Sequence, residues 1–152
     1  MALRNEIHSE ATIEASADQV WAVLSDFGSY GEWNPGMQSV QGEAVAGTRL
    51  TIRFALNGGR TMTMRPTVLV AEPGRELRWL GRLVMPGLLD GEHWFTIEER
   101  EPGRVTFRQD ERFRGLLVPF LRKMIEVDTL ATFHEVNEAV ARRVAELRSS
   151  RA

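Results

Sequence analysis

The sequence predicts an α+β fold in which a curved antiparallel sheet of about seven strands wraps around one long C-terminal helix. Two observations predict it. Short segments of alternating apolar and polar residues, separated by turns with Gly or Pro, recur between residues 6 and 113, and no Gly or Pro follows Pro119. Alternation with period two is typical of strands with one buried face. A long amphipathic helix is the natural cover for that face.

The N-terminal part is predicted to be a strand and a short helix. Residues 6–14 alternate as a strand does. Ser16 is a good N-cap, and Asp18 places an acid in the first turn of a helix over residues 17–25. The apolar face of this helix consists of Val20, Trp21, Val23 and Leu24. The next stretch is broken into turns by Gly28, Gly31, Pro35 and Gly36.

Apolar and polar residues that alternate with a period of two predict the central strands. Asn57-Gly58-Gly59 predicts a hairpin turn between a strand over residues 50–56 and one returning strand over residues 62–70. Further strands are predicted over residues 77–81, 93–98 and 105–113, with turns at Pro73-Gly74 and Pro102-Gly103, and Gly115 ends the sheet.

The C-terminal segment is predicted to be one helix of about 30 residues, on the order of 45 Å long. Its apolar residues recur every three or four positions and give a single apolar stripe. They are Leu121, Met124 or Ile125, Phe133, Val136, Val140, Val144 and Leu147.

Composition limits the function classes. The net charge is −2, with both signs mixed along the chain, so we expect no nucleic-acid partner. Cysteine is absent, which excludes disulfides and thiolate chemistry. The start of the sequence lacks a secretory apolar core, and the longest apolar run, Leu116 to Leu121, is too short to span a bilayer. We therefore expect one cytoplasmic domain over residues 1–152, without stable membrane insertion.

Several local sequences occur in an order that is specific as a set. They are Ala15-Ser16-Ala17-Asp18-Gln19-Val20-Trp21, Trp33-Asn34-Pro35, Leu77-Arg78-Trp79, Gly91-Glu92-His93-Trp94-Phe95, Val105-Thr106-Phe107, Glu111-Arg112-Phe113-Arg114-Gly115 and Phe133-His134-Glu135-Val136-Asn137. From about residue 6 to 148 the chain resembles the START-like or SRPBCC superfamily of polyketide cyclases and dehydrases, lipid-transfer domains and plant ligand-binding allergens. The resemblance implies a helix-grip fold whose cavity holds a mostly apolar molecule. Its members range from enzymes to pure carriers.

The predicted cavity wall is the inward face of the sheet. Every second residue of a strand points to the same face of the sheet. If Leu77, Ile97 and Val105 face the helix, aromatic, thioether and polar side chains at alternate positions also lie on that face. Such a surface suits an oriented apolar ligand. The candidate cavity residues are Trp33, Phe54, Met64, Trp79, His93, Phe95, Phe107, Gln109, Glu111, Phe113, Met124 and Asp128.

Each polar candidate has a structural alternative. His93 and Glu111 form a candidate general acid–base pair. In the structural alternative, neighbouring groups satisfy the hydrogen bonds of His93, and Glu111 is paired with an arginine. Trp33 is a cavity lid or a structural plug, and Asp128 faces the cavity mouth or lies at a solvated edge of the helix. The opposite parity places Trp94 on the outer face, together with Arg49, Arg53, Arg65, Arg78 and Arg82.

Three functions remain open. The first is a protein that binds an apolar or amphipathic small molecule (lipid, isoprenoid or polyketide-like). The second is an enzyme of the polyketide cyclase or dehydratase type, a lyase or isomerase using His93 and Glu111. The third is a protein-interaction module similar to activators of a chaperone ATPase. No phosphate loop, metal signature or nucleophile elbow is present, so we expect no metal and no cofactor. The identity of the ligand and the oligomeric state stay open.

Overall fold

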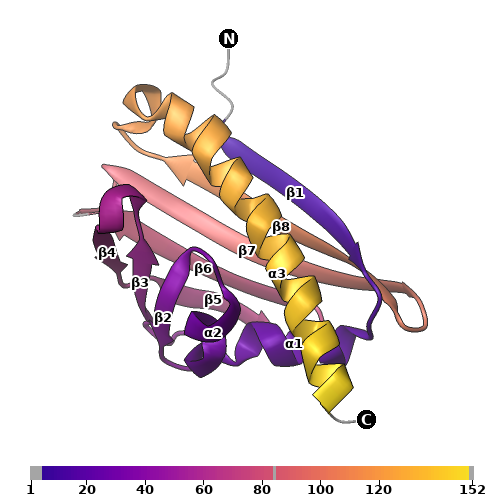
Figure 1. Ribbon diagram of the computed structural model, residues 1–152. Helices are drawn as coiled ribbons and strands as arrows, with labels where there is room; N and C mark the ends of the chain where they lie inside the picture. Colours follow the sequence, from indigo (N-terminus) through magenta and orange to yellow (C-terminus); the bar gives the residue numbers. More distant parts are fainter. Residues whose placement is uncertain (1–4, 84, 151–152) are drawn as a thin grey trace.

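The computed structural model describes residues 5–83 and 85–150 (Figure 1). In chain order the elements are β1 (Glu6–Ile13), α1 (Ala17–Ser25), η1 (Phe27–Ser29), α2 (Tyr30–Trp33), β2 (Met37–Gln41), β3 (Thr51–Ala55), η2 (Asn57–Gly59), β4 (Thr61–Met64), β5 (Thr67–Glu72), β6 (Glu76–Leu83), β7 (Leu89–Glu101), β8 (Arg104–Arg114), η3 (Val118–Phe120), η4 (Met124–Asp128) and α3 (Thr129–Ser150).

The strands described here form two antiparallel sheets. One has the order β1-β8-β7-β6-β5 and the other the order β2-β3-β4. Figure 1 shows α3 crossing one face of the five-stranded sheet, while the three-stranded sheet closes one side. The predicted helix-grip architecture is therefore confirmed, with the sheet divided in two.

The division occurs where the sequence predicted one strand over residues 62–70. In the structure β4 ends at Met64 and β5 begins at Thr67. Pro66, which lies between them, has no N–H to contribute to a ladder, and its carbonyl accepts a hydrogen bond from the backbone N–H of Leu50 (2.8 Å). The chain bends here, so that β4 pairs with β3 and β5 pairs with β6. The sequence also gave no indication of β2.

The N-terminal helix forms as predicted. The Ser16 hydroxyl accepts a hydrogen bond from the Gln19 backbone N–H (3.2 Å), and the Gln19 side chain accepts one from the Ser16 N–H (2.9 Å). This reciprocal capping box satisfies two N–H groups that a helix start leaves without partners. The buried face of α1 consists of Val20, Val23 and Leu24.

The C-terminal helix is continuous from η4 through α3, close to the predicted length. Its first part is a wider π turn over Met124–Asp128. The Met124 carbonyl accepts hydrogen bonds from the Thr129 backbone N–H, five residues further on, and from the Thr129 hydroxyl (3.1 Å). No helix within the described residues is long and apolar enough to cross a membrane.

Two hydrophobic clusters are buried between the sheets and α3. The larger lies at the end where α1 and the C-terminal half of α3 meet the sheet. The smaller consists of Ile7, Phe113, Ile125 and Phe133, near η4. The inward polar side chains lie between these clusters, and this layer is the candidate site.

Candidate functional site

The inward side chains of the five-stranded sheet form rows, because the strands are in register. One row consists of Trp79 on β6, His93 on β7, Glu111 on β8 and Ile7 on β1. The next consists of Leu77, Phe95, Gln109 and Ser9 in the same strand order. The inward parity predicted for Trp79, His93, Phe95, Gln109 and Glu111 brings them together in these two rows.

His93 is enclosed by aromatic rings. Its imidazole stacks on Trp79, with ring centroids 5.3 Å apart, and meets the edges of Phe95 (4.6 Å) and Phe133 (5.1 Å). Only 6% of the residue is exposed. The ring nitrogen Nδ1 lies 3.6 Å from Oε2 of Glu111. The other nitrogen, Nε2, is buried and has no hydrogen-bond partner among the described residues. Buried polar atoms without partners are rare in folded proteins, so Nε2 of His93 is the most unusual polar atom of this layer.

Two glycines leave space that Glu111 and Met64 occupy. Gly81 and Gly91 pair across β6 and β7, two residues along each strand from the row of His93. A Cβ atom on Gly91 would lie 2.9 Å from Oε1 of Glu111, and one on Gly81 would lie 2.8 Å from the Met64 methyl group. The missing side chains therefore make room for a carboxylate and a flexible thioether on the concave face. The Glu111 side chain keeps 18% of its surface exposed, so this end of the site reaches solvent.

Gln109 belongs to a buried network that joins α3 to the sheet. Its Nε2 donates to the Phe133 carbonyl (3.1 Å) and to Oδ1 of Asn137 (2.7 Å). The Asn137 amide donates in turn to the Ser9 hydroxyl (3.0 Å). The sequence did not single out Asn137 or Ser9. The available signals were that Ser9 shares the strand parity of the apolar Ile7 and that Asn137 lies four residues after Phe133, on the apolar stripe.

The predicted aromatic residues divide into two groups. Phe95 and Phe107 stack on each other with centroids 5.8 Å apart, are almost fully buried and belong to the larger cluster. Phe113 belongs to the smaller cluster. Phe54 and Trp33 are only partly buried and pack at the edge of the larger cluster. Phe107 is thus core, whereas Phe54 and Trp33 retain surface.

The remaining candidates lie toward the outside. Met124 and Asp128 are both exposed in η4, and for Asp128 this is the solvated edge position that the sequence offered as its alternative. Next to Trp33, the Asn34 side chain caps a turn by accepting from the N–H groups of Gly36 (2.9 Å) and Met37 (3.0 Å). The amide nitrogen of Asn34, like Nε2 of His93, is buried without a partner among the described residues.

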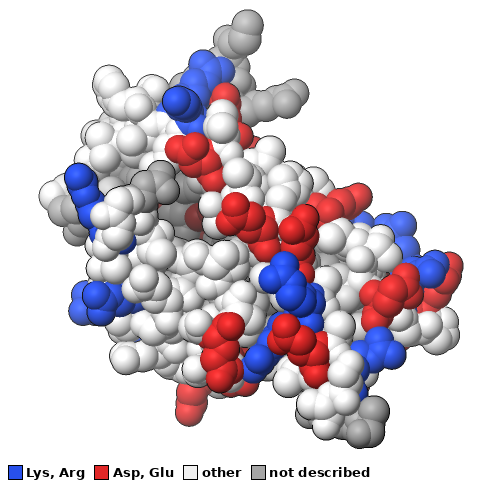
Figure 2. Space-filling model, in the orientation of Figure 1, with Lys and Arg blue, Asp and Glu red and all other residues white. Residues whose placement is uncertain are grey.

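Figure 2 shows the molecule hollowed between α3 and the β3–β4 hairpin. Two further pockets open elsewhere, one of about 540 Å³ beside β4 and β6 and one of about 210 Å³ between α1 and α3. Met64 borders the first of these. No three His, Asp or Glu side chains in the described parts of the chain are grouped so that they could hold a metal ion.

The outer face carries the opposite set of side chains, as predicted. The guanidinium of Arg78 lies 4.4 Å from the centre of the Trp94 ring, and that of Arg112 lies 5.8 Å from it. Trp94 is therefore covered by cations on the face opposite His93, which fixes the inward and outward parity of β7.

Solved structures share this architecture. A START superfamily protein from Mycobacterium smegmatis superposes with a TM-score of 0.73 at 18% identity over 93% of this chain and 98% of its own. The Zhui aromatase/cyclase from Streptomyces sp. R1128 gives 0.73 at 18% identity over 92% and 93%. Norcoclaurine synthase from Thalictrum flavum, in complex with dopamine and hydroxybenzaldehyde, gives 0.69 at 17% identity over 93% and 86%. At these identities the likeness establishes the fold.

Sequence comparison gives the family. No curated protein matches the chain in sequence. The model of one family, described as polyketide cyclase / dehydrase and lipid transport, matches residues 4–145, nearly the whole chain. The chain therefore belongs to the polyketide cyclase/dehydrase and lipid transport family.

Proposed function

We propose that this protein binds an apolar or amphipathic small molecule, such as a lipid, an isoprenoid or a polyketide-like aromatic, between the concave sheet face and α3. The observation that carries the proposal is His93, whose Nε2 is buried inside aromatic walls without a partner among the described residues. Leaving such an atom unsatisfied costs about 1–3 kcal/mol. A ligand hydroxyl that donates a hydrogen bond to Nε2 would offset that cost.

The surroundings of His93 support an apolar ligand body. The glycine pair lets Glu111 and Met64 lie close against the concave face, and Met64, which lies over Gly81, is a side chain that repacks easily around different shapes. Phe54 retains accessible surface near this end. Among the structurally similar proteins, norcoclaurine synthase holds aromatic molecules, and Zhui is an aromatase/cyclase. These names favour aromatic and polyketide-like compounds as the first ligands to test.

The alternative is an enzyme of the cyclase or dehydratase type, and the His93–Glu111 pair favours it. With Nδ1 3.6 Å from the Glu111 carboxylate, His93 would remove or deliver a proton at a carbon next to a ligand carbonyl through Nε2. Glu111 would orient the imidazole. The reaction class is that of a lyase or isomerase in which the chain's own imidazole and carboxylate carry the proton.

The binding proposal is tested by native mass spectrometry of gently purified protein, compared with its denatured mass. We expect an additional small-molecule mass that is lost on denaturation. Gly91→Leu would fill the space under Glu111 and should remove that mass. Thr96→Leu adds the same side chain to the opposite face of β7 and should retain it. A ligand that stays bound equally to both variants would place the binding site elsewhere.

If the native protein carries no ligand, the same variants are titrated with an aromatic panel such as hydroxybenzaldehyde. Saturable binding by the wild type and Thr96→Leu, but not by Gly91→Leu, supports the proposal. Phe54→Asp is a second lining variant. Phe107→Asp would be uninformative, because Phe107 is fully buried and an unpaired carboxylate there would unfold the core. Absence of binding by all proteins would reject the binding function.

The rate at which the protein converts its ligand distinguishes a carrier from an enzyme. Once a ligand is known, His93→Ala should lower the rate of its conversion by about 10²- to 10⁴-fold if His93 is the acid or base. His134→Ala replaces an exposed histidine on α3 and serves as the control. Equal rates for both variants would remove His93 from the chemistry and leave the carrier function.

A further inference from the structure

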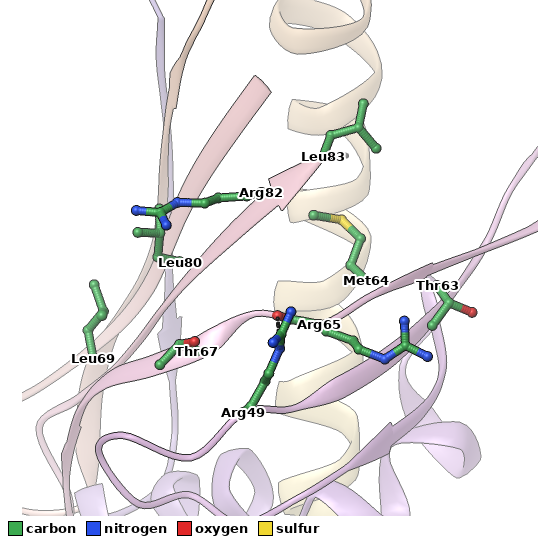
Figure 3. A pocket seen from close by; sticks show the side chains of 9 residues that line it. All are labelled: Arg49, Thr63, Met64, Arg65, Thr67, Leu69, Leu80, Arg82 and Leu83. Atoms are coloured by element: carbon green, nitrogen blue, oxygen red, sulfur yellow. Dashed lines mark hydrogen bonds between the residues drawn. The ribbon is translucent and has the colours of Figure 1, made fainter. Parts of the chain in front are cut away.

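The split between the two sheets creates a wedge on the outer side of the molecule. β5 and β6 are paired as far as Thr67 and Leu80, while β6 continues to Leu83. β4 is the last strand of its own sheet and pairs with β3 alone. A pocket of about 540 Å³ opens at this division, shown in Figure 3. Such a volume is in the range of small-molecule sites.

Three arginines from separate segments line this wedge. Arg49 precedes β3, Arg65 lies in the bend between β4 and β5, and Arg82 is near the end of β6. All three are exposed, and none forms an ion pair with a carboxylate in the described part of the chain. The nearest cross-strand acid, Asp90 opposite Arg82, is directed to the Gly87 backbone N–H instead (3.3 Å).

Some arginines elsewhere on the outer face have carboxylate partners. Arg78 is held by Glu76 (3.2 Å) and Glu92 (2.7 Å). Arg108 is held by Glu10 (3.2 Å) and by Glu98 at 3.0 Å. Arg78 and Arg108 are therefore neutralised, whereas Arg49, Arg65 and Arg82 have no carboxylate partner among the described residues. Three cations around a concave surface leave a positive potential that an anion would neutralise.

The rest of the wedge combines apolar side chains with the hydroxyl groups of Thr63 and Thr67. Met64, Leu69 and Leu80 contribute to its wall, and Leu69 is 41% exposed. Figure 3 shows the Arg49 side chain with those of Arg82 and Arg65 to either side of it. The wall therefore combines guanidinium groups, which match phosphate and carboxylate oxygens, with a surface that prefers hydrocarbon.

We propose that this wedge binds a small organic anion, in which a phosphate or carboxylate group is attached to a compact apolar body. Arg49, Arg65 and Arg82 bind the anionic group, and Leu69 and Leu80 contact the apolar part. The concave shape selects a free molecule over the headgroups of a flat bilayer. The arginines of the wedge lie on the face opposite the His93 site, because Leu80 and Arg82 alternate with the inward Trp79 and Gly81. Met64 borders both sites.

The proposal is tested with octyl phosphate, kept below its micelle concentration, by calorimetric titration and by amide chemical-shift mapping. We expect saturable binding with shifts centred on Thr67 and Leu80. The triple variant Arg49→Gln/Arg65→Gln/Arg82→Gln should lose at least about tenfold in affinity. The triple variant Arg60→Gln/Arg114→Gln/Arg142→Gln removes the same charge from exposed arginines outside the wedge and should bind within about twofold of wild type. Thermal unfolding verifies that both variants are folded.

Three results would overturn the proposal. The first is an equal loss in both triple variants, which would indicate general charge attraction. The second is unchanged affinity in the wedge variant, which would place octyl phosphate in another site such as that of His93. The third is binding to phosphatidylglycerol vesicles without binding of octyl phosphate, which would identify a membrane surface as the anion. Weaker binding of octanol than of octyl phosphate would support the requirement for the anionic group.

Discussion

The Nδ1 atom of His93 lies 3.6 Å from Oε2 of Glu111, and the two residues are directly opposite each other in the β7–β8 ladder. The distance is longer than a hydrogen bond but short enough for the carboxylate to orient the ring. An ionised carboxylate only accepts hydrogen bonds, so the arrangement favours a proton on Nδ1. Nε2 then presents a lone pair to the interior. His93 therefore has a hydrogen-bond acceptor, Nε2, in the interior of the protein.

This orientation predicts the tautomer of neutral His93. Long-range ¹⁵N–¹H NMR correlations above pH 8 should show the form protonated at Nδ1 as the major one. Glu111→Gln places an amide that both donates and accepts beside Nδ1, so the mixture should shift toward the form protonated at Nε2. The exposed His134 provides an internal reference in the same spectra. A wild-type ring protonated mainly at Nε2 would contradict the role assigned to Glu111.

The network of Gln109, Asn137 and Ser9 should contribute measurably to stability. Gln109→Leu leaves the Phe133 carbonyl and Oδ1 of Asn137 buried without their donor, which should lower the free energy of unfolding by about 1–3 kcal/mol. The double variant Gln109→Leu/Asn137→Leu should cost less than the sum of the single variants, because both sides of one hydrogen bond are then removed together. Urea unfolding measures all three. If the losses in the free energy of unfolding of the two single variants add up to that of the double variant, the two amides do not act as a network.

Tyr30 should remain protonated well into the alkaline range. Its hydroxyl donates to the Leu24 carbonyl (2.6 Å), and burial, followed by the charge of Asp26, raises the pKa of Tyr30 far above its ordinary value of about 10. Tyr30 is the only tyrosine of the chain, so absorbance at 295 nm reports on it alone. The folded protein should show no tyrosinate at pH 11, and the urea-unfolded protein should titrate near pH 10.

The same shift predicts how stability depends on pH. Below pH 10 both the folded and the unfolded chain hold the Tyr30 proton, so its contribution is fully present. Above pH 10 the unfolded chain loses the proton first, and the free energy of unfolding should fall by about 1.4 kcal/mol per pH unit from this group. Tyr30→Phe lacks the hydrogen bond to Leu24, and it should lose less stability between pH 10 and 11. Equal slopes for the two proteins would contradict the buried hydroxyl.

Gly115, at the end of β8, should be intolerant of any side chain. Its φ is +129°, and a Cβ atom there would lie 2.4 Å from the Leu88 carbonyl oxygen, a backbone atom that cannot turn away. Gly115→Ala should therefore destabilise the protein by more than about 3 kcal/mol. Gly103→Ala is the matched control, since its φ is +80° with open space around it, and it should cost about 1–2 kcal/mol. Similar costs in urea unfolding would show that the contact with Leu88 relaxes freely.

The sequence was sufficient for most of the elements, because their signals are local. The capping box at Ser16, the hairpin at Asn57-Gly58-Gly59 and the long helix after Pro119 each depend on residues within a few positions of one another. The period of two also placed His93, Gln109 and Glu111 on one face. Alternate residues of a strand face the same side of the sheet however the sheet packs against its neighbours.

The prediction of one strand over residues 62–70 was wrong, because the chain bends at Pro66. A proline is compatible with an edge strand, a bulge or a break, and the choice depends on which strand lies alongside. In the structure the carbonyl of Pro66 meets Leu50, and the chain then changes partner from β3 to β6. Strand pairing is a long-range property, so the split between the sheets and the wedge lined by Arg49, Arg65 and Arg82 followed only from the tertiary structure.

By itself, the sequence determined the α+β fold, the inward face of the sheet and the residue types that this face offers a ligand. Only the tertiary structure decided that Phe107 is core and that Asn137 and Ser9 complete the network of Gln109. It also decided that Gly91 leaves space for Glu111. The physical reason is distance along the chain. Periodicity records which way a side chain points, whereas burial and contact depend on partners, such as Ser9 for Asn137, that lie 128 positions away in sequence.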